Sequence, residues 1–270
     1  GATLSFGGGT HALNAGTSFT GAGTILVAGA TLMRNAAVTA DAATTFHLSS
    51  GSVQGSGSLT LNGLMQFSGG AIDSAAPVNA NGGVTINTGN DKFMSSGAVL
   101  NLNSDTNWSA GQFRLYGATV NNAATKTLTM SFDGELQHNA STNTFNNAGI
   151  FTKSGGAGTS TVSVITNNTG TINANSGTLR FTGSGTSTGI WNAASGATLS
   201  FGSGTHSLNA GTSFTGAGTI LVAGATLMRN TAVTADAATT FHLSSGLVSG
   251  TGSLTLNGLM HLHNQRRPTL

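Results

Sequence analysis

Residues 1–48 carry the pattern that decides the fold, in the sequence GATLSFGGGTHALNAGTSFTGAGTILVAGATLMRNAAVTADAATTFHL. One short apolar cluster recurs here and beyond, in steps of 19 to 21 residues: Leu4-Ser5-Phe6, Ile25-Leu26-Val27, Phe46-His47-Leu48, Met65-Gln66-Phe67 and Val84-Thr85-Ile86. Gly, Asn or Ser bounds the clusters, and several alternate between apolar and polar residues. This pattern is typical of short β-strands separated by tight turns, and no window keeps the apolar spacing of a helix.

Two further series of apolar residues keep nearly the same step. They consist of Leu13, Leu32, Val53, Ile72 and Phe93, and of Phe19, Val38, Leu59 and Val78. Three short strands per coil of about 20 residues predict a parallel β-solenoid, since one coil cannot bury its apolar side chains alone and stacked coils pair every strand. We therefore expect an all-β, single-stranded parallel β-solenoid (β-helix) over residues 1–260, with about 13 coils in a rod of roughly 60 Å.

The composition excludes several classes of protein. Gly accounts for 41 of 270 residues, charged residues for 6% and hydrophobic residues for 38%, so neither a charged globule nor a disordered chain is expected. Nine Lys and Arg against seven Asp and Glu give no basic surface for a nucleic acid. With no apolar stretch of membrane-spanning length and no cysteine, we expect no transmembrane segment, disulfide or thiolate metal site.

One module occurs twice in the chain. Residues 1–65 return at 196–260, an offset of 195 residues, with six differences among the 65 positions. Five of the six exchange small or polar residues, as expected for turns and solvent-facing positions. The Asn pairs at 121–122, 146–147 and 167–168, which lie between the two copies, are expected to stack as amide ladders at the corners of the coils.

Residues 98–160 fit the period least well and carry two large aromatic residues together with several charges. Two interpretations stay open: coils with longer turns, or an interaction patch in which exposed aromatic side chains beside charges contact a sugar or a peptide. The candidate ligand contacts are Trp108, Arg114, Tyr116, Asp133 and Glu135.

Four runs resemble the Gly/Thr/Asn-rich coils of large bacterial surface and secreted proteins. They are GSLTLNGLMQFSGG (57–70), FNNAGIFTKSGGAG (145–158), NNTGTINANSGTLRFTGSGTSTG (167–189) and GATLSFGSGTHSLNAGTSFTGAGTI (196–220). Over nearly all of its length the chain is similar to adhesin-like, autotransporter-passenger-like and filamentous-haemagglutinin-like β-helices. The resemblance implies a right-handed β-helix, exported to the bacterial cell surface or secreted, that serves as a stalk or adhesive rod and contacts glycans or other surface molecules. We expect the chain to be part of a longer polypeptide whose export signal lies outside it.

Catalysis is not expected, and no cofactor is implied. Asp133 and Glu135 would share a strand face as a carboxylate pair, but Asp-Gly-Glu is more typical of a polar turn. Asp41 and its copy Asp236 lie in predicted turns, where aspartate caps backbone N–H groups. A polysaccharide-binding or polysaccharide-cleaving β-helix that uses residues 98–140 is the alternative to the rod.

Four smaller expectations concern a threonine column, the histidines and the C-terminus. Thr3, Thr24 and Thr45 recur at 21-residue steps, which makes an ice-binding solenoid a second alternative, although no second threonine column accompanies them. His47 is predicted to point outward, and His261 with His263 offers a metal only two ligands. Residues 261–270 leave the pattern and are interpreted as a cap of the open end or as an artefact.

Overall fold

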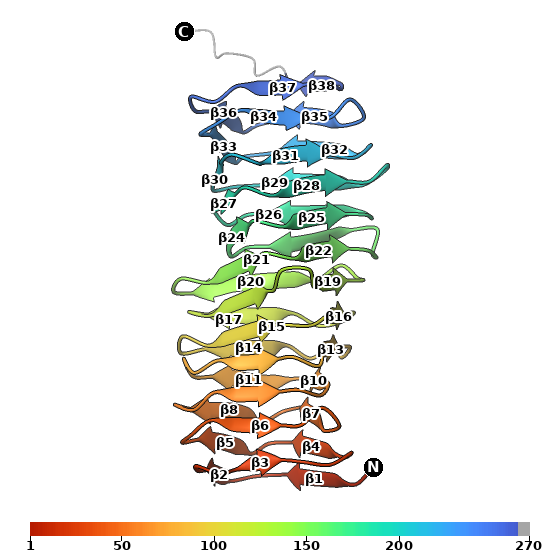
Figure 1. Ribbon diagram of the computed structural model, residues 1–270. Helices are drawn as coiled ribbons and strands as arrows, with labels where there is room; N and C mark the ends of the chain where they lie inside the picture. Colours follow the sequence, from red (N-terminus) through yellow and green to blue (C-terminus); the bar gives the residue numbers. More distant parts are fainter. Residues whose placement is uncertain (264–270) are drawn as a thin grey trace.

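Strands of two to six residues follow one another along the chain and wind into stacked coils (Figure 1). The computed structural model describes residues 1–263, and its first and last coils lie at opposite ends of a rod. Consecutive strands lie on three different faces, and each strand from β4 to β35 pairs in parallel with the strands three places before and after it. This confirms the predicted all-β solenoid with three strands per coil, with 13 strands in two sheets and 12 in the third.

The three sheets are named by their order along the chain. Sheet 1 contains β1 (Thr3–Phe6), β4 (Thr24–Val27), β7 (Thr45–Leu48), β10 (Met65–Phe67), β13 (Val84–Ile86), β16 (Thr106–Trp108), β19 (Thr127–Met130), β22 (Ile150–Lys153), β25 (Thr171–Ala174), β28 (Ile190–Ala193), β31 (Ser213–Thr215), β34 (Val233–Ala235) and β37 (Leu254–Leu256). Sheet 2 contains β2 (Thr10–Leu13), β5 (Thr31–Arg34), β8 (Ser52–Gly55), β11 (Gly70–Asp73), β14 (Lys92–Ser95), β17 (Phe113–Tyr116), β20 (Glu135–Ala140), β23 (Thr159–Val162), β26 (Thr178–Phe181), β29 (Thr198–Phe201), β32 (Thr219–Val222), β35 (Thr240–Leu243) and β38 (Met260–Leu262). Sheet 3 contains β3 (Ser18–Phe19), β6 (Val38–Ala40), β9 (Leu59–Leu61), β12 (Val78–Ala80), β15 (Val99–Leu102), β18 (Thr119–Asn122), β21 (Thr144–Asn147), β24 (Ile165–Asn168), β27 (Gly185–Ser187), β30 (Thr205–Leu208), β33 (Thr226–Arg229) and β36 (Leu247–Ser249).

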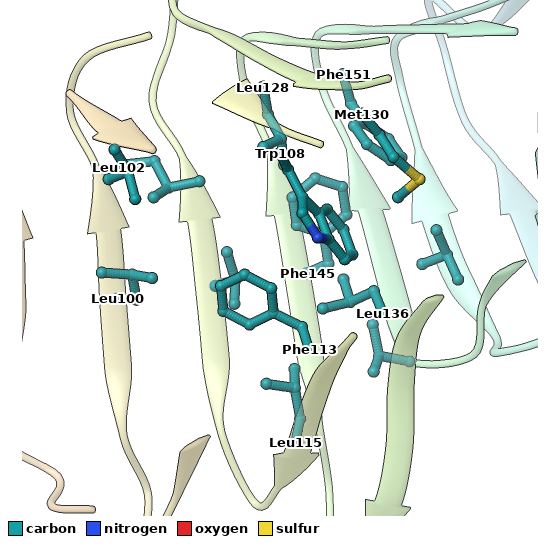
Figure 2. Close-up of a cluster of buried hydrophobic side chains, with 14 of the residues drawn as sticks. Leu100, Leu102, Trp108, Phe113, Leu115, Leu128, Met130, Leu136, Phe145 and Phe151 are labelled. Atoms are coloured by element: carbon teal, nitrogen blue, oxygen red, sulfur yellow. The ribbon is translucent and has the colours of Figure 1, made fainter. Parts of the chain in front are cut away.

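Alternation along each strand separates the core from the surface. In β4, Ile25 and Val27 point inward and are buried, whereas Thr24 and Leu26 face outward. Because paired strands keep this register from coil to coil, the inward Leu, Ile, Val and Phe side chains form one core along the rod. Within this core, Trp108 packs edge-to-face against Phe113 (Figure 2). Its ring also meets Phe132 edge-to-face.

Sharp corners between faces depend on glycine. Gly55 ends β8 with a φ of +100°, and its copy Gly250 has a φ of +102°. A Cβ at Gly55 would lie 2.4 Å from the backbone oxygen of Arg34 in the coil below. Both the backbone conformation and the close approach therefore require glycine at this corner.

Coil length varies most in the part of the chain that lies between the two copies of the module. Paired residues lie 25 apart at Asn122 and Asn147, and a β-bulge interrupts the pairing of β17 with β20. A longer coil also moves Phe93 from its expected place in the inner series, because the register sets Met94 beside Ile72. Phe93 is consequently 38% exposed, and the expectation that it lies in the core is wrong.

The expected amide ladders are present, but they run along the strands of sheet 3 and not at the corners between faces. In an outward column, each side-chain amide donates to the amide oxygen one coil below, at 2.7 to 2.9 Å, through Asn79, Asn101, Asn121, Asn146 and Asn167. A parallel inner column joins Asn122, Asn147 and Asn168, which are buried. The ladders satisfy most of these polar groups without any charge, but the buried Asn122 Oδ1 accepts no hydrogen bond from the described residues.

The two copies of the duplicated module are not separated by a whole number of coils. β1 lies in sheet 1, whereas β29, which has the same sequence, lies in sheet 2. The second copy starts 28 strands after the first, which is nine coils and one strand. The second copy is therefore turned by one face about the rod axis.

The last described strand extends two residues past the duplicated module. In β38, His261 and Leu262 pair with His242 and Leu243 of β35, while residues 264–270 of the expected cap or artefact lie outside the described residues. Between residues 1 and 263, no helix is long and apolar enough to cross a membrane.

Candidate functional site

The five predicted contact residues do not form one site. Trp108 is only 2% exposed, and its indole N–H donates to the backbone oxygens of Ala110 and Gly111 at 3.2 and 2.9 Å. The expectation of an exposed aromatic side chain at this position is wrong, because Trp108 pairs with the inward residues Ile86 and Met130 of the neighbouring strands.

Arg114 and Tyr116 lie on the outer face of sheet 2, as strand alternation requires. Phe93 of β14 pairs with Arg114 of β17, and Ser95 pairs with Tyr116, so two exposed aromatic side chains share one surface. Phe93 and Tyr116 are each 38% exposed. We call the group Asp73, Phe93, Ser95, Arg114 and Tyr116 the aromatic patch.

Hydrogen bonds fix the polar members of the aromatic patch. Asp73 accepts hydrogen bonds from Ser95 Oγ at 2.8 Å and from Ser96 Oγ at 2.5 Å. Arg114 Nε donates to Asp91 Oδ2 at 2.5 Å, and both side chains are about one-third exposed. The arrangement presents two aromatic rings beside hydrogen-bonding groups, a combination that suits the apolar face and hydroxyls of a sugar.

Asp133 and Glu135 make separate contacts. Asp133 precedes β20 and accepts a hydrogen bond from the buried Lys153 Nζ at 2.7 Å. This bond, with another from the N–H of Gly158, holds the pKa of Asp133 below its usual range. Glu135 starts β20 and accepts a hydrogen bond from Ser163 Oγ at 3.4 Å. Asp133 thus anchors a buried lysine.

Three buried cations escaped the sequence analysis: Arg34, Lys92 and Lys153. Lys92 Nζ donates to the backbone oxygens of Thr88 and Asn90, both at 2.6 Å, and burial lowers its pKa to about 8. Strand alternation offered a signal for Lys153, since Phe151 two residues earlier points into the core.

Several smaller predictions have clear outcomes. Asp41 Oδ1 accepts the backbone N–H groups of Ala43 and Thr44 at 3.0 Å, and Asp236 does the same in the second copy, so both are turn caps as predicted. His47 faces outward and contacts Ser68 Oγ at 2.8 Å, which confirms its predicted direction.

The threonine column and the C-terminal histidines also have clear positions. Thr3, Thr24 and Thr45 are register partners on sheet 1. The rings of His242 and His261 lie 5.9 Å apart. No group of three or more His, Cys, Asp or Glu suited to a metal occurs in the part of the chain that the structure describes.

Comparison of the chain with protein-family models, with curated proteins and with solved structures found no match.

Proposed function

We propose that this chain is a rigid, non-enzymatic rod of a bacterial surface or secreted adhesin-like protein. The observation that carries the proposal is the unbroken parallel pairing from β1 to β38, with one apolar core along its whole length. Continuous pairing couples each coil to its neighbours, which makes such a stack stiff along its axis. The Gly/Thr/Asn-rich sequence supports the placement at a bacterial surface.

Distance measurement between spin labels tests rigidity. The chain has no cysteine, so Thr39→Cys with Thr234→Cys gives two defined label sites on exposed, outward positions. They lie nine coils and one strand apart, which corresponds to about 45 Å along the axis at ~4.8 Å per coil. We expect one narrow distance distribution. A broad distribution in a folded sample would contradict the rod.

A second proposal is that the aromatic patch binds an extended polysaccharide. It rests on the juxtaposition of Phe93 and Tyr116, the two exposed aromatic side chains on neighbouring strands. A glycan array and a depolymerisation screen on the folded chain test it. We expect binding without cleavage. The affinity should fall at least tenfold in the double variant Phe93→Ala/Tyr116→Ala and stay unchanged in the control Thr39→Ala. A chain inert to every glycan would leave the rod alone, and cleavage would overturn the non-enzymatic assignment.

A further inference from the structure

The side of the rod has an open hollow of about 380 Å³ at the corner between sheets 2 and 3. Its walls come from three consecutive coils, where the chain passes from β20 to β21, from β23 to β24 and from β26 to β27. None of the residues that line it is charged. We call it the polar hollow, and the residues that carry the argument are His138, Ser141, Asn143, Ser163, Ile165 and Ser184.

A β-bulge brings His138 to the wall of the polar hollow. In β20, His138 pairs with Leu115, and the register then shifts so that Ala140 pairs with Tyr116. A bulge interrupts the alternation of inward and outward side chains, so His138 is exposed although its partner Leu115 is buried. Ser141 follows with a φ of +59°, a backbone conformation that is uncommon outside glycine and that clusters at ligand sites.

Asn143 holds the wall of the polar hollow in place and sets the tautomer of His138. Its side chain is 1% exposed, and its Oδ1 accepts the backbone N–H groups of Gly117 and Ala118 at 2.7 and 3.0 Å. Because this fixes the orientation of the amide, Nδ2 donates to His138 Nδ1 at 2.7 Å. A neutral His138 therefore carries its proton on Nε2, which donates to none of the described residues and is available to a ligand.

The polar hollow combines this N–H donor with hydroxyl groups and an apolar side chain. Ile165 is 36% exposed, and the hydroxyls of Ser163 and Ser184 lie in the same wall. A carboxylate stands behind the wall, since Ser163 Oγ donates to Glu135 at 3.4 Å. This carboxylate disfavours an anionic ligand, whereas a neutral sugar finds partners for its hydroxyls and for its apolar face.

The polar hollow is continuous with the aromatic patch. Tyr116 belongs to the patch and pairs with Ala140 of β20, and the next residue, Gly117, donates to Asn143 in the hollow. From β14, which carries Phe93, to β26 at the far side of the hollow there are four coil steps. They correspond to about 19 Å along the axis at ~4.8 Å per coil. A chain of several sugar units along the axis would therefore reach both.

We propose that the polar hollow binds a neutral sugar unit of a polysaccharide that lies along the rod axis and crosses the aromatic patch. The inference rests on the proposed binding of a polysaccharide by that patch. It adds the direction of the bound chain, the absence of charge on the recognised unit, and two residues that determine specificity. His138 Nε2 donates to a hydroxyl of this unit, and Ile165 packs against its apolar face.

Affinity electrophoresis of the full chain tests the proposal, with dextran, a β-1,3-glucan and a galactomannan as neutral probes and polygalacturonate as the acidic probe. For a neutral polymer that retards the parent chain, His138→Ala and Ile165→Ala should each weaken binding about fivefold, the effect of one lost contact. The matched controls His47→Ala and Ile150→Ala change the same side chains on sheet 1 and should leave binding unchanged. Circular dichroism checks that all four variants fold.

The outcomes separate this inference from the proposal on which it rests. If Phe93→Ala/Tyr116→Ala abolishes binding while His138→Ala and Ile165→Ala leave it intact, the polar hollow is no site and the aromatic patch stands. Retardation by polygalacturonate alone overturns the neutral ligand. If no polymer retards the parent chain, the polysaccharide proposal fails and this inference fails with it.

The imidazole signals in NMR spectra give a measurement that needs no change in the binding site. The spectrum of His138→Ala identifies the signal of His138 in the parent chain, and that of His47→Ala identifies the control. Adding the neutral polymer should shift the His138 signal and leave that of His47 in place. Binding that moves neither signal contradicts the assignment of His138.

Discussion

The two copies of the module have almost the same sequence and differ in what lies above and below them. Local geometry is retained: the ring centroids of Phe6 and His11 lie 4.9 Å apart, and those of Phe201 and His206 lie 4.8 Å apart. Burial is not retained, since His11 is exposed and His206 is 2% exposed. In a solenoid, the sequence of a coil thus determines its own contacts, and its neighbours determine how much of it is buried.

For the arginine pair Arg34 and Arg229, the residue in the first copy is the more buried one. Arg34, in the first copy, is fully buried and donates to Ser74 Oγ at 2.5 Å and to the backbone oxygens of Gln54 and Pro77 at 3.1 and 3.3 Å. Its counterpart Arg229 is partly exposed and donates to Ser249 and Gly250. The difference arises because Ser74 and Pro77 belong to a coil that follows the first copy only.

The largest difference between the copies is expected for Phe201→Ala and Phe6→Ala. Phe201 is fully buried against Phe181, Trp191 and Phe214, so truncation should lower the free energy of unfolding by about 4 kcal/mol. Phe6 is half-buried in the first described coil, so Phe6→Ala should lower the free energy of unfolding by only about 1–2 kcal/mol. Urea titration of both variants gives the comparison, and equal losses would contradict the dependence on neighbours.

For Arg34→Ala and Arg229→Ala, the larger loss of stability is expected in the first copy. Removing Arg34 leaves a cavity and several acceptors without a donor, at a cost of about 3 kcal/mol. Arg229→Ala should cost below about 1 kcal/mol, because its acceptors are reached by water. Thermal melts of the two variants in one buffer check the ranking. A larger loss from Arg229→Ala would be inconsistent with the burial of Arg34.

Acid should destabilise the chain through His206. Burial lowers the pKa of His206 from 6.5 to about 4, so between these values the unfolded chain binds the proton and the folded chain does not. The free energy of unfolding is therefore unaffected by His206 above about pH 6.5 and falls as the pH drops toward 4. At pH 5 the decrease is about 2 kcal/mol. His206→Leu should flatten this slope in urea titrations at pH 7 and pH 5, whereas His11→Leu keeps it. Equal slopes in the parent and His206→Leu would refute the assignment.

The smallest expected difference is between Asp41→Ala and Asp236→Ala. Each aspartate caps a turn within its own coil and accepts a hydrogen bond from one neighbouring coil, at Gly21 or Gly216, with the same geometry in both copies. We therefore expect equal, small decreases in Tm. Unequal decreases would show that position along the rod also affects local caps.

Sequence reasoning was most reliable where contacts repeat from coil to coil. The strand period, the amide ladders and the turn role of Asp41 all depend on such repeats. Trp108 and Phe93 were misjudged because coil lengths vary between 84 and 162, and a change of one residue in register exchanges inward and outward positions. Lys153 was missed although alternation from Phe151 places it inward. The aromatic patch could not be predicted, because it depends on the register in which β14 pairs with β17. The spacing of residues along the chain does not reveal that register.

The offset of nine coils and one strand between the two copies of the module also sets the direction in which surface features face. An outward side chain such as His47 on sheet 1 reappears as His242 on sheet 2. Any further duplication of the same length would advance the feature by one more face, so that only every third repeat returns to the same side. Successive copies would therefore place a surface motif on successive faces of the rod, in a helical arrangement. Neighbouring copies of the motif could not bind one flat partner together, so avidity would be low, but the motif would be accessible from every side of the rod.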